Sequence, residues 1–180
     1  MTNTQTFPEE FGMSRASSLE QDAARLDACV ARLGEARDMI ASIIFGQDEA
    51  VDQTLIGVLA GGHVLMVGAP GLGKSLMAHT LGKALGLLDK RVQFTPDLMP
   101  ADILGSEVLD DGPDGKRAFR FIKGPVFCQL LLADEINRAS PRTQSALLQA
   151  MQEREISVAG YSHALPVPFH VLATQNPLEQ

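Results

Sequence analysis

Hydrophobic residues at intervals of three and four predict a long amphipathic helix in the N-terminal part of the chain. Ser18 and Gln21 fit a capping box, which places the helix start at Ser18. Residues 1–17 are polar and without periodicity, and we expect a flexible arm there. Gly34 is a candidate break in the helix. This helix is expected to pack on the domain that follows, and a partner-binding helix is the alternative. The positions that define it are Leu26, Cys29, Val30, Leu33, Ile40 and Ile44.

A second helix is predicted from Asp48, and Gly61-Gly62 should end it. The apolar run His63–Val67 then predicts a strand, and a glycine-rich loop follows. The next helix is expected from Lys74 to Leu85. Its hydrophobic positions again repeat at three and four, so we expect them in the core: Leu76, Met77, Leu81, Ala84 and Leu85.

Three further apolar runs predict strands at residues 91–95, 129–133 and 169–174. The run at 129–133 is nearly continuous, as is typical of a central parallel strand buried on both faces, and the run at 169–174 is expected to be a fourth parallel strand. Ser140 as N-cap and Pro141 at the first helical position place another helix between them. Strands that alternate with helices predict an α/β sandwich around a parallel sheet.

Two β-hairpins are expected to interrupt this alternation. The first pairs residues 106–109 with 118–122 around a turn at Asp110–Gly115. The second pairs Glu155–Val158 with Ala164–Val167 around Gly160.

Composition narrows the classes of function. The 180 residues carry 15 basic and 22 acidic side chains, a net charge of −7 that disfavours nucleic acid as a partner. Apolar runs are too short for a transmembrane segment, and the N-terminus lacks the features of a signal peptide. Cys29 and Cys128 lie far apart, and two reduced thiols in a cytoplasmic protein are expected.

The glycine-rich loop Gly68–Ser75 fits the pattern G-x-x-x-x-G-K-[ST] between a strand and a helix. Glycines allow the backbone N–H groups to surround phosphate oxygens, and the helix N-terminus adds a positive partial charge. Lys74 is positioned for the outer phosphates and Ser75 for Mg²⁺. The alternative is an ordinary strand-to-helix turn with a surface lysine.

Asp134 and Glu135 follow a buried strand at its C-terminal end, the edge of an open α/β sheet where ligands bind. Asp134 is expected to hold Mg²⁺, and Glu135 to orient and deprotonate the attacking water. The alternative is a solvated acidic strand end. Asn176 follows the last strand, where its amide either contacts the γ-phosphate or simply suits a turn before Pro177.

Arg138 and Arg142 leave three roles open: solvated residues at a helix start, salt-bridge partners within the fold, or contacts with the nucleotide of a neighbouring subunit. The four histidines lack metal-ligand spacing. His170 lies inside a predicted strand, where a hydrogen-bonded structural histidine is expected.

Four blocks together resemble the MoxR family of AAA+ ATPases. In order along the chain they read GHVLMVGAPGLGKS, RVQFTPDLMPADILGSEVL, GPVFCQLLLADEINRASPRTQSALLQAMQEREISVAG and ATQNP. The resemblance covers residues 45–180. It is specific to this family, because several long blocks match in the same order.

This resemblance implies a P-loop NTPase three-layer sandwich with strand order 5-1-4-3-2 and two hairpin inserts. Gly68–Ser75 matches Walker A, Leu130–Glu135 matches Walker B, and Asn176 matches sensor 1. The implied catalytic residues are Glu135, Lys74 and Asn176, and the implied Mg²⁺ ligands are Ser75 and Asp134. The implied ATP-binding residues are Phe45, Gly46, Gln47, Gly68, Ala69, Pro70, Gly71, Leu72, Gly73, Lys74, Ser75 and Leu76.

Members of the family are similar to chaperone-like ring ATPases, commonly hexameric, that act with von Willebrand A-domain proteins on client complexes. The resemblance therefore implies ATP and Mg²⁺ as cofactors, a homo-oligomer and a cytoplasmic location. Two alternatives are a nucleotide-dependent scaffold with negligible turnover and a nucleic-acid motor, which the acidic composition disfavours.

The family pattern continues beyond Gln180 with a fifth strand, an arginine finger and a helical lid. Residues 18–180 thus correspond to an incomplete AAA+ domain, and strand 1 is expected at an exposed sheet edge. A fragment of a longer protein and a degenerate chain both fit this departure, and we favour the fragment.

Overall fold

The computed structural model describes residues 10–69, 71–111 and 117–177. Most of the predicted turn at Asp110–Gly115 lies outside these residues. The helices are α1 (Glu10–Ile43), α2 (Asp48–Leu59), α3 (Lys74–Ala84), α4 (Pro100–Leu104) and α5 (Pro141–Glu153), with a short 3₁₀ helix η1 (Ile136–Arg138). The strands are β1 (Val64–Val67), β2 (Asp89–Gln93), β3 (Gly105–Asp111), β4 (Arg117–Lys123), β5 (Leu130–Asp134), β6 (Glu155–Val158), β7 (Tyr161–Ala164) and β8 (His170–Gln175).

Four parallel strands form the central sheet in the order β1-β8-β5-β2. Counted along the chain, these are strands 1, 4, 3 and 2, so the predicted α/β fold and its strand order are confirmed. Residues of β5 and the first five of β8 are buried throughout, which explains their nearly continuous apolar sequences. Within the described residues, β1 and β2 are the two edge strands.

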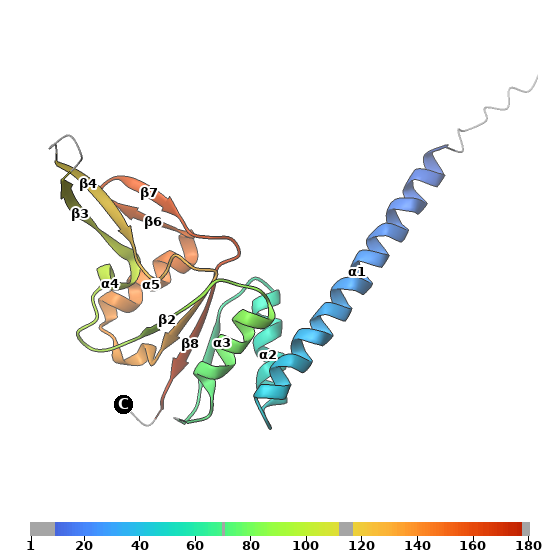
Figure 1. Cartoon of the computed structure of the whole chain (residues 1–180), viewed down its shortest axis with the longest axis horizontal. Coiled ribbons are helices and arrows are strands. Elements are labelled where there is room, and N and C mark those ends of the chain that lie inside the picture. The colour runs from blue at the N-terminus through green and yellow to red at the C-terminus, as the bar shows by residue number, and fades with distance from the viewer. Residues whose placement is uncertain (1–9, 70, 112–116, 178–180) are drawn as a thin grey trace, which may run out of the picture.

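Successive residues of the central strands supply two hydrophobic clusters, one on each face of the sheet. Leu130, Leu132 and Leu172 pack with α1, α2 and α3 on one face. Leu131 and Val171 pack with α4 and α5 on the other. The result is a three-layer arrangement, with α2, α3 and the end of α1 together on one side of the sheet (Figure 1).

Helix α1 differs from its prediction in two respects. It begins at Glu10 rather than at Ser18, so part of the expected arm is helical, and it continues without a break through Gly34. A Cβ at Gly34 would meet no atom within 4 Å, and a single exposed glycine costs a helix only about 1 kcal/mol. None of the helices in the described part of the chain is long and apolar enough to cross a membrane.

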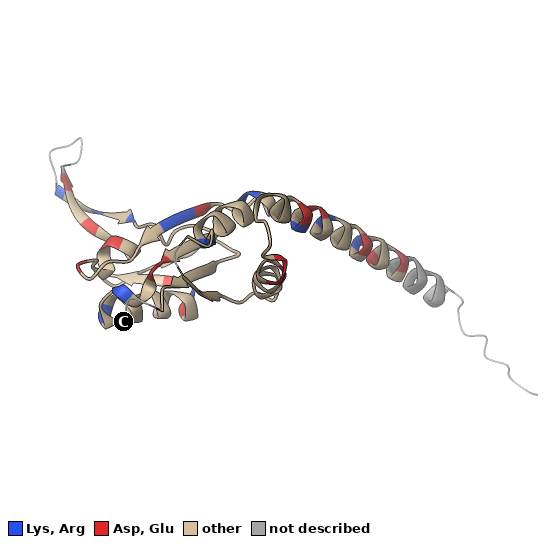
Figure 2. Cartoon of the chain, turned by 90° about the horizontal axis from the view of Figure 1, so that it is seen from below, with Lys and Arg blue, Asp and Glu red and all other residues tan. Residues whose placement is uncertain are grey.

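Only the C-terminal part of α1 packs on the domain. Ile40 and Ile44 are buried, whereas Leu26 and Val30 of the same hydrophobic stripe are 65% and 61% exposed. Arg37 fastens this end to α2, because its Nε lies 2.5 Å from Oδ1 of Asp52. The remainder projects from the body, with acidic and basic side chains interspersed along it (Figure 2).

The two predicted hairpins form at the opposite end of the molecule from α1 (Figure 1). In the second, β7 is Tyr161–Ala164 rather than Ala164–Val167. The correction arises because Ala159 and Gly160 both have positive φ, which closes a two-residue turn directly after Val158. The rings of Phe121 in β4 and His163 in β7 stack with centroids 4.2 Å apart and join the hairpins.

Two smaller corrections and one confirmed expectation concern single positions. Strand β2 begins at Asp89, two residues before the predicted start, because pairing with β5 extends back to Leu130. Leu76, expected in the core, is 49% exposed because it lies in the first turn of α3, beside the glycine-rich loop. His170 meets its expectation as a buried, hydrogen-bonded histidine, with Nδ1 2.9 Å from the carbonyl oxygen of Gly62.

Candidate nucleotide-binding site

The glycine-rich loop joins the C-terminal end of β1 to the N-terminus of α3. Gly71 and Gly73 have φ angles of 82° and 71°, a conformation that a side chain would strain. The Gly68 N–H donates to the carbonyl oxygen of Gln175, which fixes the loop beside the end of β8. Residues 74 onward are helical, so the free N–H groups of the first turn of α3 lie at the loop.

A cavity of ≈ 410 Å³ lies where this loop meets the ends of the central strands. It brings together residues separated by more than a hundred positions, from Gly71 to Asn176, and most of the predicted site residues line it. Its lining consists of Gly71, Leu72, Gly73, Lys74, Ser75, Leu76, Arg91, Gln93, Asp134, Glu135, Thr174 and Asn176. Pro70, predicted to bind ATP, lies outside the described residues.

Lys74 lies at the cavity but is directed back onto its own loop. Its Nζ donates to the carbonyl oxygens of Gly68, at 2.5 Å, and Ala69, at 2.8 Å. These contacts keep the ammonium close to the phosphate-binding backbone. A bound phosphate offers a charged acceptor in place of the two neutral carbonyls, which favours release of Lys74.

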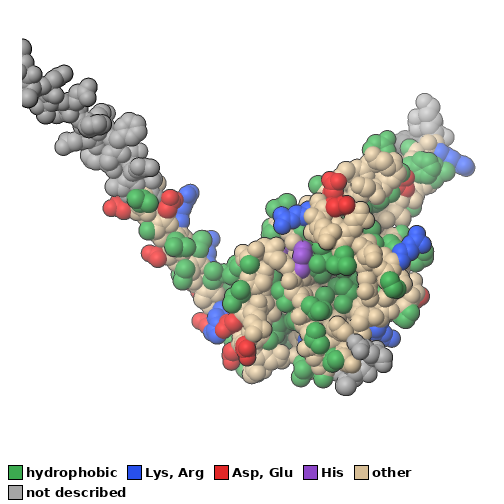
Figure 3. All heavy atoms as spheres, turned by 180° about the vertical axis from the view of Figure 1, so that it is seen from behind, with side chains coloured by type: hydrophobic (Ala, Val, Ile, Leu, Met, Phe, Trp, Pro, Cys, Tyr) green, Lys and Arg blue, Asp and Glu red, His purple; other side chains and the backbone are tan. Residues whose placement is uncertain are grey.

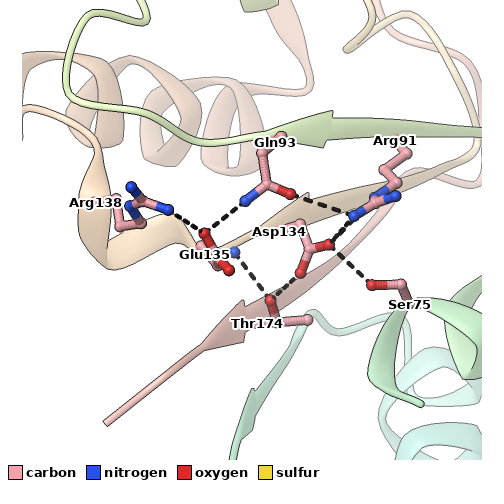
Figure 4. A network of polar contacts seen from close by, with 7 residues as sticks. All are labelled: Ser75, Arg91, Gln93, Asp134, Glu135, Arg138 and Thr174. Atoms are coloured by element: carbon pink, nitrogen blue, oxygen red, sulfur yellow. Dashed lines mark hydrogen bonds and ion pairs between the residues drawn. The ribbon is translucent and has the colours of Figure 1, made fainter. Parts of the chain in front are cut away.

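Asp134 is the centre of the polar network in Figure 4. Its Oδ1 accepts a hydrogen bond from Thr174 Oγ1 at 2.5 Å, and its Oδ2 accepts from Ser75 Oγ at 2.8 Å. Arg91 donates to Oδ2 through Nη2, at 2.6 Å, and Nε, at 3.2 Å. Burial raises the pKa of Asp134, but these hydrogen bonds and the charge of Arg91 outweigh it and hold that pKa below its ordinary value. Asp134 is therefore ionised at neutral pH.

Glu135 has a left-handed backbone, with φ of 56°, and its N–H donates to Thr174 Oγ1 at 2.9 Å. This conformation turns the side chain toward β2 and η1. There its Oε2 accepts from Gln93 Nε2 at 2.7 Å and from Arg138 Nη1 at 2.8 Å (Figure 4). Arg138 is thus a salt-bridge partner of Glu135 within the fold, one of the three roles that the sequence left open.

The donor set at Ser75 and Asp134 suits Mg²⁺. A hydroxyl and a carboxylate oxygen lie 2.8 Å apart, and Mg²⁺ prefers hard oxygen ligands. The described residues contain no cluster of three or more His, Cys, Asp or Glu side chains that would hold a metal unaided. Mg²⁺ is commonly held by one or two protein groups together with phosphates and water.

Two other predicted elements lie at the edges of the site. Asn176 is 5% exposed and lines the cavity just past β8. Gln47 donates from Nε2 to the Leu72 carbonyl oxygen at 2.7 Å, which connects the start of α2 to the loop. Gln47 also lines a second cavity of ≈ 330 Å³ beside the loop. Phe45 is 82% exposed, and the role of Phe45–Gln47 at the adenine stays a prediction.

Sequence reasoning missed three residues of the network: Thr174, Arg91 and Gln93. A partial signal existed for two of them, because Arg91 and Gln93 alternate with Val92 and so share one face of the predicted strand. The predicted strand began at Arg91, whereas β2 ends at Gln93, so the structure is what places both residues at the C-terminal edge of the sheet. Thr174 was predicted only as a strand residue. A threonine in an otherwise apolar run at the sheet edge where ligands bind was the signal for it.

The chain matches the model of a family described as "ATPase family associated with various cellular activities (AAA)" over residues 63–180. It is 48% identical over 137 residues to "Chaperone MoxR1" of Mycobacterium tuberculosis, covering 76% of this chain and 36% of that protein. The chain belongs to the MoxR family of AAA+ ATPases.

Other relatives extend the comparison. "Protein MoxR" of Methylorubrum extorquens is 34% identical over 146 residues, covering 78% of this chain and 41% of that protein. A crystal structure of a putative ATPase from Cytophaga hutchinsonii is 40% identical, with a TM-score of 0.75, and covers 90% of this chain and 49% of that one. The chain therefore spans less than half the length of each of these three proteins.

Proposed function

We propose that this chain binds ATP with Mg²⁺ and that the protein to which it contributes hydrolyses ATP. The observation that carries the proposal is the single cavity shared by the glycine-rich loop, Asp134, Glu135 and Asn176. Membership of an ATPase family supports it.

Each residue has a distinct proposed role. Lys74 neutralises the outer phosphates, while Ser75 and Asp134 hold Mg²⁺, which supplies charge neutralisation between the β- and γ-phosphates when bound. Glu135 orients the attacking water and accepts its proton. Asn176 donates its amide hydrogen atoms to the γ-phosphate or to that water.

We extend the proposal to the assembly and its partners. The protein forms a chaperone-like ring, commonly hexameric in this family, in the cytoplasm. With a von Willebrand A-domain protein, the ring remodels client complexes. The name of the Mycobacterium relative, a chaperone, supports the chaperone part. Cys29 and Cys128 are both unpaired, in keeping with a reducing compartment.

A scaffold with negligible turnover is the second candidate, and one observation favours it. The carboxylate of Glu135 is bound to Gln93 and Arg138, and Lys74 is bound to its own loop. Hydrolysis requires both groups to exchange these partners for water and phosphate.

Binding and turnover of a fluorescent ATP analogue separate the two candidates. We expect Lys74→Ala to weaken Mg²⁺-dependent binding by about tenfold or more, because a charge-assisted contact to phosphate is lost. Lys83→Ala, an exposed lysine later in the same helix, is the matched control and should bind like the wild type.

Glu135→Gln should bind nucleotide normally but release phosphate about 100-fold more slowly, the contribution of a general base. Normal binding with equal, background turnover in wild type and Glu135→Gln would instead support the scaffold. Equal binding by wild type and Lys74→Ala would contradict the assignment of the site.

A further inference from the structure

The carboxylate of Asp134, the proposed metal ligand, already accepts hydrogen bonds from other side chains of the protein. Both carboxylate oxygens accept hydrogen bonds, from Thr174 on one side and from Ser75 and Arg91 on the other. Thr174 and Ser75 are neutral, so Arg91 supplies the only positive charge among these three donors. A carboxylate with a 10% exposed side chain needs such a charge to remain ionised at low cost.

Arg91 can leave this position more readily than Thr174 can. It projects from the edge strand β2, and its side chain is 59% exposed. Thr174, in contrast, is buried in the sheet. Among the described residues, Gln93 holds the outer side of Arg91, because its Oε1 accepts a hydrogen bond from Nη2 at 3.2 Å.

Space for a displaced guanidinium exists on both sides. Arg91 lines the candidate nucleotide cavity and also a neighbouring cavity of ≈ 370 Å³, along the α3 side of β2. The second cavity is also lined by Asp89. Asp89 lies two residues before Arg91 and so on the same face of the strand. Its Oδ2 lies 2.9 Å from Nδ1 of His79, so a displaced Arg91 would share this carboxylate with His79.

We propose that Arg91 is a resident counter-ion of Asp134 that competes with divalent metal, so that the chain excludes free Mg²⁺ and accepts it together with nucleotide. The inference rests on the proposed function, because it assumes that Asp134 is a metal ligand. A guanidinium and a divalent cation on one carboxylate oxygen repel each other, so Arg91 must withdraw when the metal binds. Nucleotide phosphates favour this exchange because they add negative charge at the same place. Arg91 is a positioning residue in this scheme.

The test measures Mn²⁺ binding without nucleotide, by the loss of the electron paramagnetic resonance signal of free Mn²⁺. Arg91→Gln should bind Mn²⁺ about tenfold more tightly than the wild type, because a competing positive charge is gone. Arg91→Lys keeps the charge but loses the paired donors, and it should lie between the two.

Two controls make the readout specific. Lys90→Gln removes one positive charge from the adjacent position of the same strand and should leave Mn²⁺ affinity unchanged. Asp134→Asn, added to Arg91→Gln, should abolish the gained affinity. Circular dichroism checks that each variant is folded, and Arg91→Lys provides the comparison if Arg91→Gln does not fold.

The outcomes distinguish this inference from the proposed function. If folded Arg91→Gln, or Arg91→Lys in its place, binds Mn²⁺ no more tightly than the wild type, the counter-ion role is wrong even where the wild type binds nucleotide. The counter-ion role would also be wrong if Lys90→Gln gained as much Mn²⁺ affinity as Arg91→Gln. The loss of any nearby positive charge would then explain the effect. If Arg91→Gln gains affinity through Asp134 but no variant binds nucleotide, the counter-ion role stands and the proposed function fails.

Discussion

At the scale of single residues, the site depends on side chains that have no place in the recognised sequence motifs. The sequence predicted that Ser75 and Asp134 would meet, because a loop after one parallel strand and the end of another share an edge, and their oxygens lie 2.8 Å apart. It did not predict that Thr174 would connect the two acidic residues. A hydroxyl in a buried strand has no pattern that specifies its partner until the register of β8 against β5 is known.

Replacement of Thr174 by valine tests this connection. The change keeps the shape of the side chain but removes the donor to Asp134 and the acceptor for the Glu135 N–H. We expect a loss of about 1–3 kcal/mol in the free energy of unfolding, because buried polar groups are left unsatisfied. Urea denaturation measures it.

Thr54→Val is the matched control for that measurement. Thr54 is also buried, but its hydroxyl donates to the carbonyl oxygen of Ala50, four residues earlier in its own helix, where the backbone N–H ladder already supplies a donor. A Thr174→Val protein as stable as Thr54→Val would show that the network contributes little to folding.

At the scale of elements, the periodic sequence predicted that α1 is helical but not how much of it would be buried. Its hydrophobic stripe runs through Leu26, Val30, Ile40 and Ile44, yet only the last two are buried. Periodicity reports which face is apolar, whereas burial depends on where the neighbouring elements end. Gly34 likewise did not break the helix, since one unfavourable residue is outweighed by a long run of favourable ones.

Alanine substitutions along the stripe should therefore have unequal effects. Ile40→Ala removes a fully buried side chain between α1 and the domain, and we expect a loss of about 2–5 kcal/mol. Leu26→Ala, at an exposed position of the same helix, should change stability by less than about 0.5 kcal/mol. Thermal and urea unfolding check both, and equal losses would mean that the projecting part of α1 is packed in solution.

At the scale of the whole molecule, the β1 edge of the sheet exposes apolar side chains. Leu65 and Val67 of the edge strand β1 are 55% and 59% exposed. Beside them a cavity of ≈ 490 Å³ lies between β1, β8 and α5. Hydrophobic side chains also gather at the centre of the body on the face seen in Figure 3. The sequence predicted this edge, because the resemblance places a further strand beside strand 1.

An open strand edge with apolar side chains promotes association between copies of the chain. We expect Leu65→Lys to raise the concentration at which light scattering first detects aggregates, because a lysine on an edge opposes strand pairing. Ile56→Lys places the same charge on an aliphatic position of α2 that is 65% exposed. An equal improvement from Ile56→Lys would attribute the effect to net charge and not to the edge.

Helix α1 is attached to the domain at one end, and this attachment determines how far its other end can move. Its 34 residues extend about 50 Å as a rod, and it is held near one end by Ile40, Ile44 and the Arg37–Asp52 ion pair. A tilt of about 10° at the attached end would displace the far end by about 9 Å. Because α1 packs with α2 and α3, and Gln47 at the start of α2 bonds to the loop, a small tilt at this end would become a large displacement at the far end of α1.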